Sequence, residues 1–287
     1  MRNIYKDLVW LLSNHDGSFV EVNDMRRKGE RTFCGDSLMN IMMATKGRDY
    51  EEIRTKYIEE WNINLYFGFI TRCYDARVGK LLDDFQRQFC SFPDVIMINS
   101  ALWDINRWGP EGIQMFQKNI KYLMSHLKHS IKYLRPQHET QVIWMTTPPI
   151  SVEIRGGFMV KQLEFQRYSM RFNILEGNQF AANVAASFGF DVLDMHYYMC
   201  NQIHRRAADG IHWNPDAVRM QSNIFLTHFC LSRNIELPRN MKPINNKENL
   251  FLEQAKNIAQ AGREDYQNIP AIPLKQQRKV LKGRRRL

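Results

Sequence analysis

The chain has 287 residues, of which 44% are hydrophobic, 24% charged and 12% aromatic, and its formal net charge at pH 7 is +10. This composition is typical of a globular protein with one sizeable core, and it excludes collagen-like and largely disordered chains. The longest apolar runs, such as residues 95–98, have the length of a strand, so we expect no transmembrane helix.

Hydrophobic periodicity predicts that strands and long helices alternate along the chain. In order, it indicates a helix that ends near residues 14–17, a loop at 23–46, a strand at 65–70, a helix at 78–89, a strand at 94–99 and a helix at 112–134. It then indicates a strand at 141–146, a helix at 161–187, a short strand at 190–194 and a helix at 215–233. This alternation predicts right-handed crossovers and a parallel, doubly wound sheet in an α/β domain.

The last part of the chain differs in composition from the rest. Residues 240–287 are rich in Asn, Gln, Lys and Pro, which predicts a domain at 1–239 followed by a disordered basic tail. Much of the excess charge lies between Lys275 and Arg286, a stretch without any acidic residue. Such a run is interpreted as a solvated terminus, a localisation signal or a weak polyanion-binding patch.

The cysteines and the first residues bear on the compartment. Five cysteines, an odd number without a CxxC pair, argue against a disulfide framework and a zinc site, so we expect reduced thiols and no metal. The charged N-terminal segment differs from a signal peptide, which predicts a cytoplasmic or nuclear location.

Ligands of open α/β sheets bind beyond the carboxyl ends of the strands. Polar residues follow three predicted strands, at 99–108, 146–149 and 208–215. The last of these segments places Asp209 and His212 three residues apart, just before a helix. An Asp-x-x-His turn can orient the imidazole so that Nε2 accepts a proton from a nucleophile. The spacing also fits a helix cap by Asp209 and a histidine that packs beside Trp213.

Several motifs in collinear order carry a resemblance to a known family. The motifs are Tyr5–Val9, Ile98–Asp104, Gly156–Phe158, Phe190–His196 and Asp209–Pro215. Together they resemble the PC-esterase family, and most closely its PC-esterase domain-containing protein 1 group, within the GDSL/SGNH hydrolases. The resemblance extends from Met1 to about Arg239.

The resemblance implies a flavodoxin-like (SGNH hydrolase) three-layer domain with a parallel sheet, which hydrolyses acyl esters without a metal or an organic cofactor. It assigns the base to His212 and the orienting carboxylate to Asp209. The loop 99–104 takes the place of a Gly-x-Asn-Asp block, so Asn99 or a backbone N–H there is the candidate oxyanion donor. The expected cleft for a small ester or acylated substrate is lined by Asn99, Trp103, Asp104, Asp209, His212 and Trp213.

The nucleophile implied by the resemblance is a serine in a Gly-Asp-Ser turn, between an apolar strand and a helix that contains Arg-x-x-Tyr-Lys-Asp. This sequence begins inside that helix, so we expect the first central strand and its serine to be missing. The motif recurs at Gly35 to Ser37, but the charged segment 25–34 precedes it instead of a buried strand. Ser37 therefore remains an alternative nucleophile.

Three hypotheses about function follow. The first is a PC-esterase-like domain without hydrolytic competence, either a truncated isoform or a pseudoenzyme, which binds ligands in its cleft. The second is an active acyl esterase that uses Ser37. The third is an interaction protein that acts through its basic tail. The first is favoured, because removal of the nucleophile from a Ser-His-Asp unit lowers the rate by several orders of magnitude.

Overall fold

The structure is a computed structural model that describes residues 1–14, 17–39, 47–48, 50–86, 93–134, 140–155, 158–159 and 161–237. The chain divides into two units, Met1–Asn234 and Ile235–Leu287, and the fold described below is that of the first. The predicted basic run from Lys275 to Arg286 lies outside the described residues, as do Gly156 and Gly157 of the family motif.

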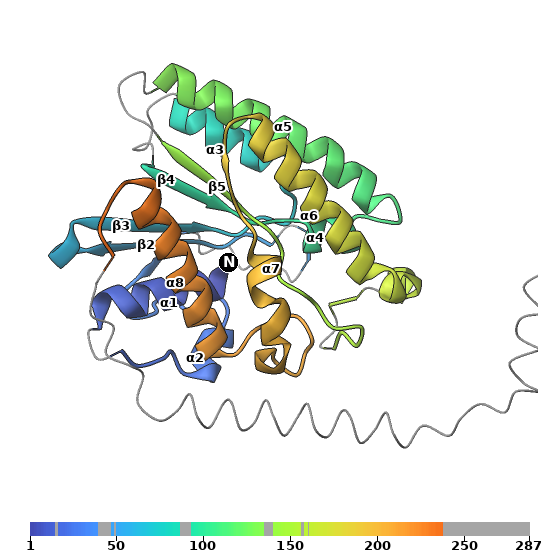
Figure 1. Cartoon of the computed structure of the whole chain (residues 1–287), viewed down its shortest axis with the longest axis horizontal. Coiled ribbons are helices and arrows are strands. Elements are labelled where there is room, and N and C mark those ends of the chain that lie inside the picture. The colour runs from blue at the N-terminus through green and yellow to red at the C-terminus, as the bar shows by residue number, and fades with distance from the viewer. Residues whose placement is uncertain are drawn as a thin grey trace, which may run out of the picture. The chain divides into compact units, whose positions relative to one another are not determined.

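A parallel three-stranded sheet forms the centre of the first unit. Its strands β4 (Val95–Ile98), β5 (Gln141–Met145) and β6 (Asp191–Leu193) lie in this order. Both pairs are parallel, with Val95 opposite Gln141 and Ile143 opposite Asp191. The long helices α5 (Gly112–Leu134) and α6 (Met170–Ser187) connect the strands (Figure 1). The predicted α/β fold with a parallel sheet is therefore confirmed.

Successive residues of β4 and β5 pack on opposite faces of this sheet, as the period of two in a strand requires. One face packs against α3 (Ala76–Gln86), α4 (Leu102–Arg107), α5 and α6, and its strand residues are Ile96, Ile98, Val142 and Trp144. The other face packs against α1 (Arg2–Ser13) and α8 (Pro215–Ser232), and its strand residues are Val95, Met97, Ile143 and Met145. Helices thus cover both faces, which gives the expected three layers (Figure 1).

A second, antiparallel sheet is present that the hydrophobic pattern does not predict. It has the order β1 (Ser37–Leu38), β2 (Ile53–Ile58) and β3 (Ile63–Gly68). The 3-10 helix η1 (Glu59–Trp61) and Asn62, at φ 50°, close the hairpin between β2 and β3. The interpretation of 23–46 as loop is therefore wrong in part, because α2 (Val22–Arg26) and β1 lie in or overlap it.

Shorter helices also differ from the predicted elements. The helix expected at 161–187 divides into η2 (Lys161–Tyr168), a 3-10 helix, and α6. After β6 the chain forms α7 (Met195–Met199) and η3 (Cys200–Arg205), which the pattern does not predict. Among the helices of the described residues, none combines the length and the apolar composition that a membrane crossing requires.

Strand β4 is the outer strand of the parallel sheet. All four of its residues are only partly buried, whereas Val142 to Met145 of β5 are at most 3% exposed. No strand of the described residues pairs with the outer edge of β4. In a flavodoxin-like order the first strand occupies this position, next to the third. The described strands therefore leave that position open.

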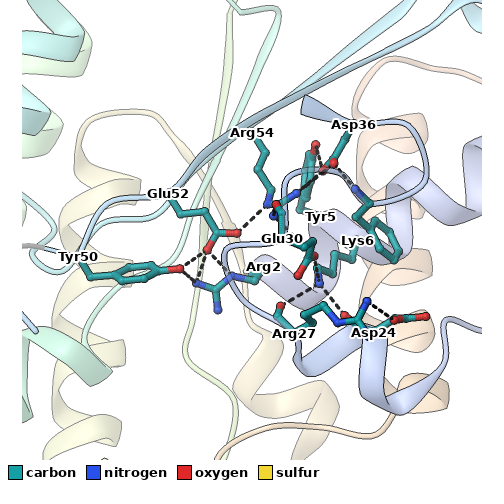
Figure 2. A network of polar contacts seen from close by, with 11 residues as sticks. Arg2, Tyr5, Lys6, Asp24, Arg27, Glu30, Asp36, Tyr50, Glu52 and Arg54 are labelled. Carbon is teal, nitrogen blue, oxygen red and sulfur yellow. Dashed lines mark hydrogen bonds and ion pairs between the residues drawn. The ribbon is translucent and has the colours of Figure 1, made fainter. Parts of the chain in front are cut away.

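A buried ionic network connects α1 to the antiparallel sheet (Figure 2). Arg54 of β2 is fully buried and donates to both carboxylate oxygens of Asp36 at 3.0 Å and to Glu52 at 2.7 Å. From α1, the Tyr5 hydroxyl donates to Asp36 at 3.1 Å, and Arg2 donates to Glu52 at 2.7 Å. These paired carboxylates offset the cost of burying a guanidinium.

Replacement of Arg54 by methionine tests this network. The variant leaves two buried carboxylates without their shared partner, so we expect the free energy of unfolding to fall by about 3–5 kcal/mol. Urea denaturation followed by circular dichroism measures the difference. The control is Lys80→Met, which removes an exposed ion pair with Asp84 at 2.6 Å and should cost less than about 1 kcal/mol. Similar small losses in both variants would contradict a stabilising role for Arg54.

Candidate active site

Asp209 and His212 form a hydrogen-bonded pair just before α8. The imidazole Nδ1 lies 2.7 Å from Oδ2 of Asp209, and because a carboxylate only accepts, Nδ1 carries the hydrogen. The other carboxylate oxygen, Oδ1, accepts the backbone N–H groups of Ile211 and His212, both at 2.9 Å. This arrangement leaves Nε2 of His212 free to accept a proton, and 46% of the imidazole side chain is exposed.

Gly210 allows this turn to approach the segment that follows β5. Its φ of +81° is unfavourable for other residues, and a Cβ atom here would lie 2.4 Å from the carbonyl oxygen of Glu153. The backbone N–H of Ser151 donates to the backbone carbonyl of Gly210 at 2.8 Å, and that of Arg155 donates to the backbone carbonyl of Asp209 at 2.9 Å. These bonds hold the Asp-x-x-His turn beside the segment that leaves the carboxyl end of β5.

The alternative interpretation of this spacing, a helix cap, does not describe the observed contacts. The N-cap residue of α8 is Asn214, and Pro215 follows at the first helical position. Trp213 is only 7% exposed and packs with residues of α1 and α8. Trp213 thus belongs to the core behind the turn, while His212 lies at the surface.

The ionisation of Asp209 depends on these contacts. Burial by itself raises the pKa of the carboxyl group, but the hydrogen bond from His212 and the two backbone N–H donors outweigh it. The pKa of Asp209 therefore lies below its ordinary value, and the group is a carboxylate at neutral pH.

The loop after β4 is held by the buried side chain of Asp104, at the start of α4. Asp104 is 2% exposed, accepts the backbone N–H of Cys73 at 3.0 and 3.2 Å, and also accepts the hydroxyl of Ser100. Burial raises the pKa of Asp104 in spite of these bonds. Ala101, which lies between Ser100 and Asp104 in the sequence, has a φ of 115°, which is strained for a residue with a Cβ atom. Asp104 therefore shapes this loop from within.

Asn99, the candidate oxyanion donor, joins the ends of β4 and β5. Its Nδ2 lies 2.9 Å from the carbonyl oxygen of Met145 and 3.3 Å from the hydroxyl oxygen of Thr147. Both amide hydrogens are thus engaged within the protein. Asn178 of α6 holds the same segment, because it accepts the Thr147 N–H and donates to the Thr147 carbonyl, both at 2.8 Å. The sequence pattern gives no signal for this role of Asn178.

Trp103 is a partly exposed member of an aromatic group on α4 and its neighbours. It meets Phe69 edge to face at a centroid distance of 5.5 Å and Phe158 at 6.1 Å. The guanidinium carbon of Arg107 lies 4.9 Å from the Trp103 ring centroid and 5.4 Å from that of Phe158. Of these three aromatic residues, the sequence places only Trp103 in the cleft; Phe158 appears only as part of a family motif, and Phe69 is not singled out.

Ser37 occupies β1 of the antiparallel sheet, opposite Thr55, and is exposed. The residue before it, Asp36, is turned into the buried network with Arg54 (Figure 2). In the part of the chain that the structure describes, no hydrogen bond joins the hydroxyl of Ser37 to His212. The structure thus brings Asp209 and His212 together without adding Ser37 to the pair.

Metal-binding side chains are not clustered in the described residues. No three His, Cys, Asp or Glu side chains in that part of the chain are close enough to hold an ion together. Cys34, Cys73, Cys200 and Cys230 are free thiols, and Cys90 lies outside the described residues.

Comparison of the sequence with known proteins confirms the resemblance. The chain is 29% identical over 245 residues to the human protein "PC-esterase domain-containing protein 1A", a match that covers 84% of this chain and 52% of that protein. It is also 29% identical over 241 residues to human "PC-esterase domain-containing protein 1B", with 83% and 54% covered. The chain thus spans about half the length of these relatives. No family model matches the sequence.

Solved structures with a similar fold include several named as esterases. An aryl esterase of M. smegmatis has a TM-score of 0.41 and 15% identity, with 56% of this chain and 73% of that chain covered. The acetyl xylan esterase AlAXEase has a TM-score of 0.40 and 15% identity, with 56% and 77% covered.

Replacement of Asp209 by asparagine tests the ionised pair. Because the pKa of Asp209 is lowered in the folded state, its carboxylate stabilises the fold above the unfolded-state value of about 3.9. We expect the variant to lose about 1 kcal/mol at pH 7, and the loss to shrink as the pH falls below about 4, where the wild type also loses this contribution. Urea denaturation between pH 7 and pH 2.5 measures this difference.

The matched control is Glu153→Gln, which alters an exposed carboxylate beside the same turn. It should change the free energy of unfolding by less than about 0.5 kcal/mol. A loss in the Asp209 variant that stayed constant over the whole pH range would be inconsistent with a lowered pKa.

Proposed function

We propose that this is a PC-esterase-like domain, impaired in acyl-ester hydrolysis, that retains His212 as general base and Asp209 as its orienting carboxylate. The observation that carries the proposal is the 2.7 Å bond between Nδ1 of His212 and Asp209, which leaves Nε2 as the proton acceptor. The similarity to PC-esterase domain-containing proteins 1A and 1B supports the same reaction class. In that reaction a hydroxyl attacks the ester carbonyl while Nε2 removes its proton.

The chain described here supplies the base more clearly than the nucleophile. Among the described residues, no hydroxyl forms a hydrogen bond with Nε2 of His212. A base without a positioned nucleophile retains little of the rate of the complete unit. We therefore infer that this chain binds ester substrates and hydrolyses them slowly or not at all. The exposed side of Trp103, with Phe69 and Phe158 beside it, offers apolar surface to an acyl or sugar group.

The second candidate is an active esterase in which Ser37 attacks the substrate. Its support is the Gly-Asp-Ser sequence and the exposure of Ser37. Against it, both carboxylate oxygens of the preceding Asp36 accept hydrogen bonds from Arg54. The motif is therefore part of the buried network, and no hydrogen bond of the described residues connects it to His212.

A fluorophosphonate probe separates the two candidates, because it reacts with a serine only where a base activates the hydroxyl. For the full chain we expect no stoichiometric labelling. We also expect slow hydrolysis of p-nitrophenyl acetate that falls in His212→Ala, where the base is lost, and is unchanged in Ser37→Ala. Mass spectrometry of the intact protein and absorbance at the nitrophenolate band measure the two effects.

Other results have distinct meanings. Stoichiometric labelling that disappears in Ser37→Ala would establish Ser37 as the nucleophile and overturn the inference of impaired activity. Labelling that survives in Ser37→Ala but disappears in His212→Ala would place another serine at the site. Hydrolysis that is equal in the wild type and in His212→Ala would remove the role of the base.

A further inference from the structure

Two arginine side chains from distant segments lie over one tryptophan, and a third arginine precedes that tryptophan in the chain. Arg48 precedes β2, Arg72 follows β3, and Arg107 and Trp108 end α4. We refer to Arg48 and Arg72 over Trp108, together with the adjacent Arg107 over Trp103, as the arginine cluster. No short sequence motif indicates this cluster. Arg107 and Trp108 are adjacent, but the other members are more than 20 residues apart in sequence.

The contacts within the arginine cluster are close. The guanidinium carbon of Arg72 lies 3.7 Å from the ring centroid of Trp108, and that of Arg48 lies 5.1 Å from the same centroid. The Nε of Arg48 donates to the backbone carbonyl of Arg107 at 2.8 Å. The indole N–H of Trp108 donates to the carbonyl of Thr71 at 3.0 Å, which fixes the ring between the segments. The guanidinium groups are thus held by stacking and by backbone contacts.

Among the described residues, the carboxylate of Asp75 is already engaged by another arginine. Asp75 accepts Nη2 of Arg77 at 2.9 Å, so its charge is paired outside the arginine cluster. No carboxylate of the described residues forms an ion pair with Arg48 or Arg72. The Nε of Arg72 is buried and has no hydrogen-bond partner in the same part of the chain. An unpaired buried donor is costly, and like charges at close range repel.

The repulsion between cations also affects Arg107. Burial and the positive charge of Arg48 both lower the pKa of Arg107. Arg48 is exposed and Arg72 and Trp108 are partly exposed, so a dissolved ion can reach this surface. A bound anion would offset the repulsion between the guanidinium groups.

We propose that the arginine cluster binds a tetrahedral oxyanion, a phosphate or sulfate group. Planar guanidinium groups present pairs of N–H donors that match such oxygens, and stacking on an aromatic ring orients them in advance. Groups from three segments offer donors in several directions, which suits a tetrahedral ion better than a planar carboxylate. Arg107 also stacks on Trp103, so the anion site adjoins the aromatic side of the proposed ester cleft.

This position gives the proposed substrate a chemical class. If the cleft binds an ester, as proposed above, the anion site selects acylated molecules that carry a phosphate or sulfate group. That step rests on the proposed function, whereas the anion site itself rests on the arginine cluster alone. Direct binding measurements with the free ions therefore test the site without relying on hydrolysis.

Titration of the full chain with inorganic phosphate, sulfate and acetate tests the proposal. The first readout is the intrinsic tryptophan fluorescence, to which Trp108 is one of six contributors. The melting temperature is the second readout, because a ligand that binds only the folded state raises it. We expect phosphate and sulfate to change the fluorescence in a saturable way and to raise the melting temperature, and acetate to bind at least tenfold more weakly.

The variants Arg72→Gln and Arg48→Gln each should weaken binding of phosphate and sulfate at least tenfold. Arg72→Lys should also weaken it, because an ammonium keeps the charge without the paired donors. The control Arg31→Gln changes an exposed arginine elsewhere and should bind like the wild type. Since Arg48 is exposed, its variant remains informative even if Arg72→Gln does not fold.

Two outcomes would overturn the proposal. One is binding of equal strength in the wild type and in Arg48→Gln, which would place the anion elsewhere. The other is a melting temperature that falls in Arg72→Gln while no ion changes that of the wild type, which would make the cluster a structural stack only. If the ions bind as expected and the chain has no esterase activity, the anion site stands and only its connection to an ester substrate is lost.

Discussion

The parallel pairing of β4 with β5 positions two of the loops that form the candidate sites of this unit. Strands that run in the same direction end at the same edge, so the loops that follow Ile98 and Met145 leave the sheet side by side. The first loop leads into α4 and the arginine cluster. The second accompanies the turn that holds Asp209 and His212. Both features therefore depend on the register of four residue pairs in the core.

Buried polar side chains then fix these loops. Asp104 binds the N–H of Cys73, which ties the segment after β3 to α4, and Asn178 binds the backbone N–H and carbonyl of Thr147. In the antiparallel sheet, the carboxylate of Asp36 has the same kind of role, since it holds Arg54. Buried groups of this type are stable only when each has a partner, so they specify one loop arrangement over others.

The parts of the structure that follow from local pattern could be predicted from the sequence. Strand β5 is apolar at every buried position, and the Asp209–His212 contact spans only three residues, so both are visible in short segments. Strand β2 could not be predicted, because Arg54 makes it appear polar although Glu52 and the more distant Asp36 neutralise that side chain. The arginine cluster was likewise hidden, since stacking on Trp108 joins segments far apart in sequence.

Ala101 combines full burial with a backbone conformation that glycine adopts more easily. A residue held in this way stores roughly 1–3 kcal/mol of strain, which the bonds of its neighbour Asp104 maintain. A glycine at this position would relieve the strain, whereas the alanine restricts the loop to the conformation that leads into α4.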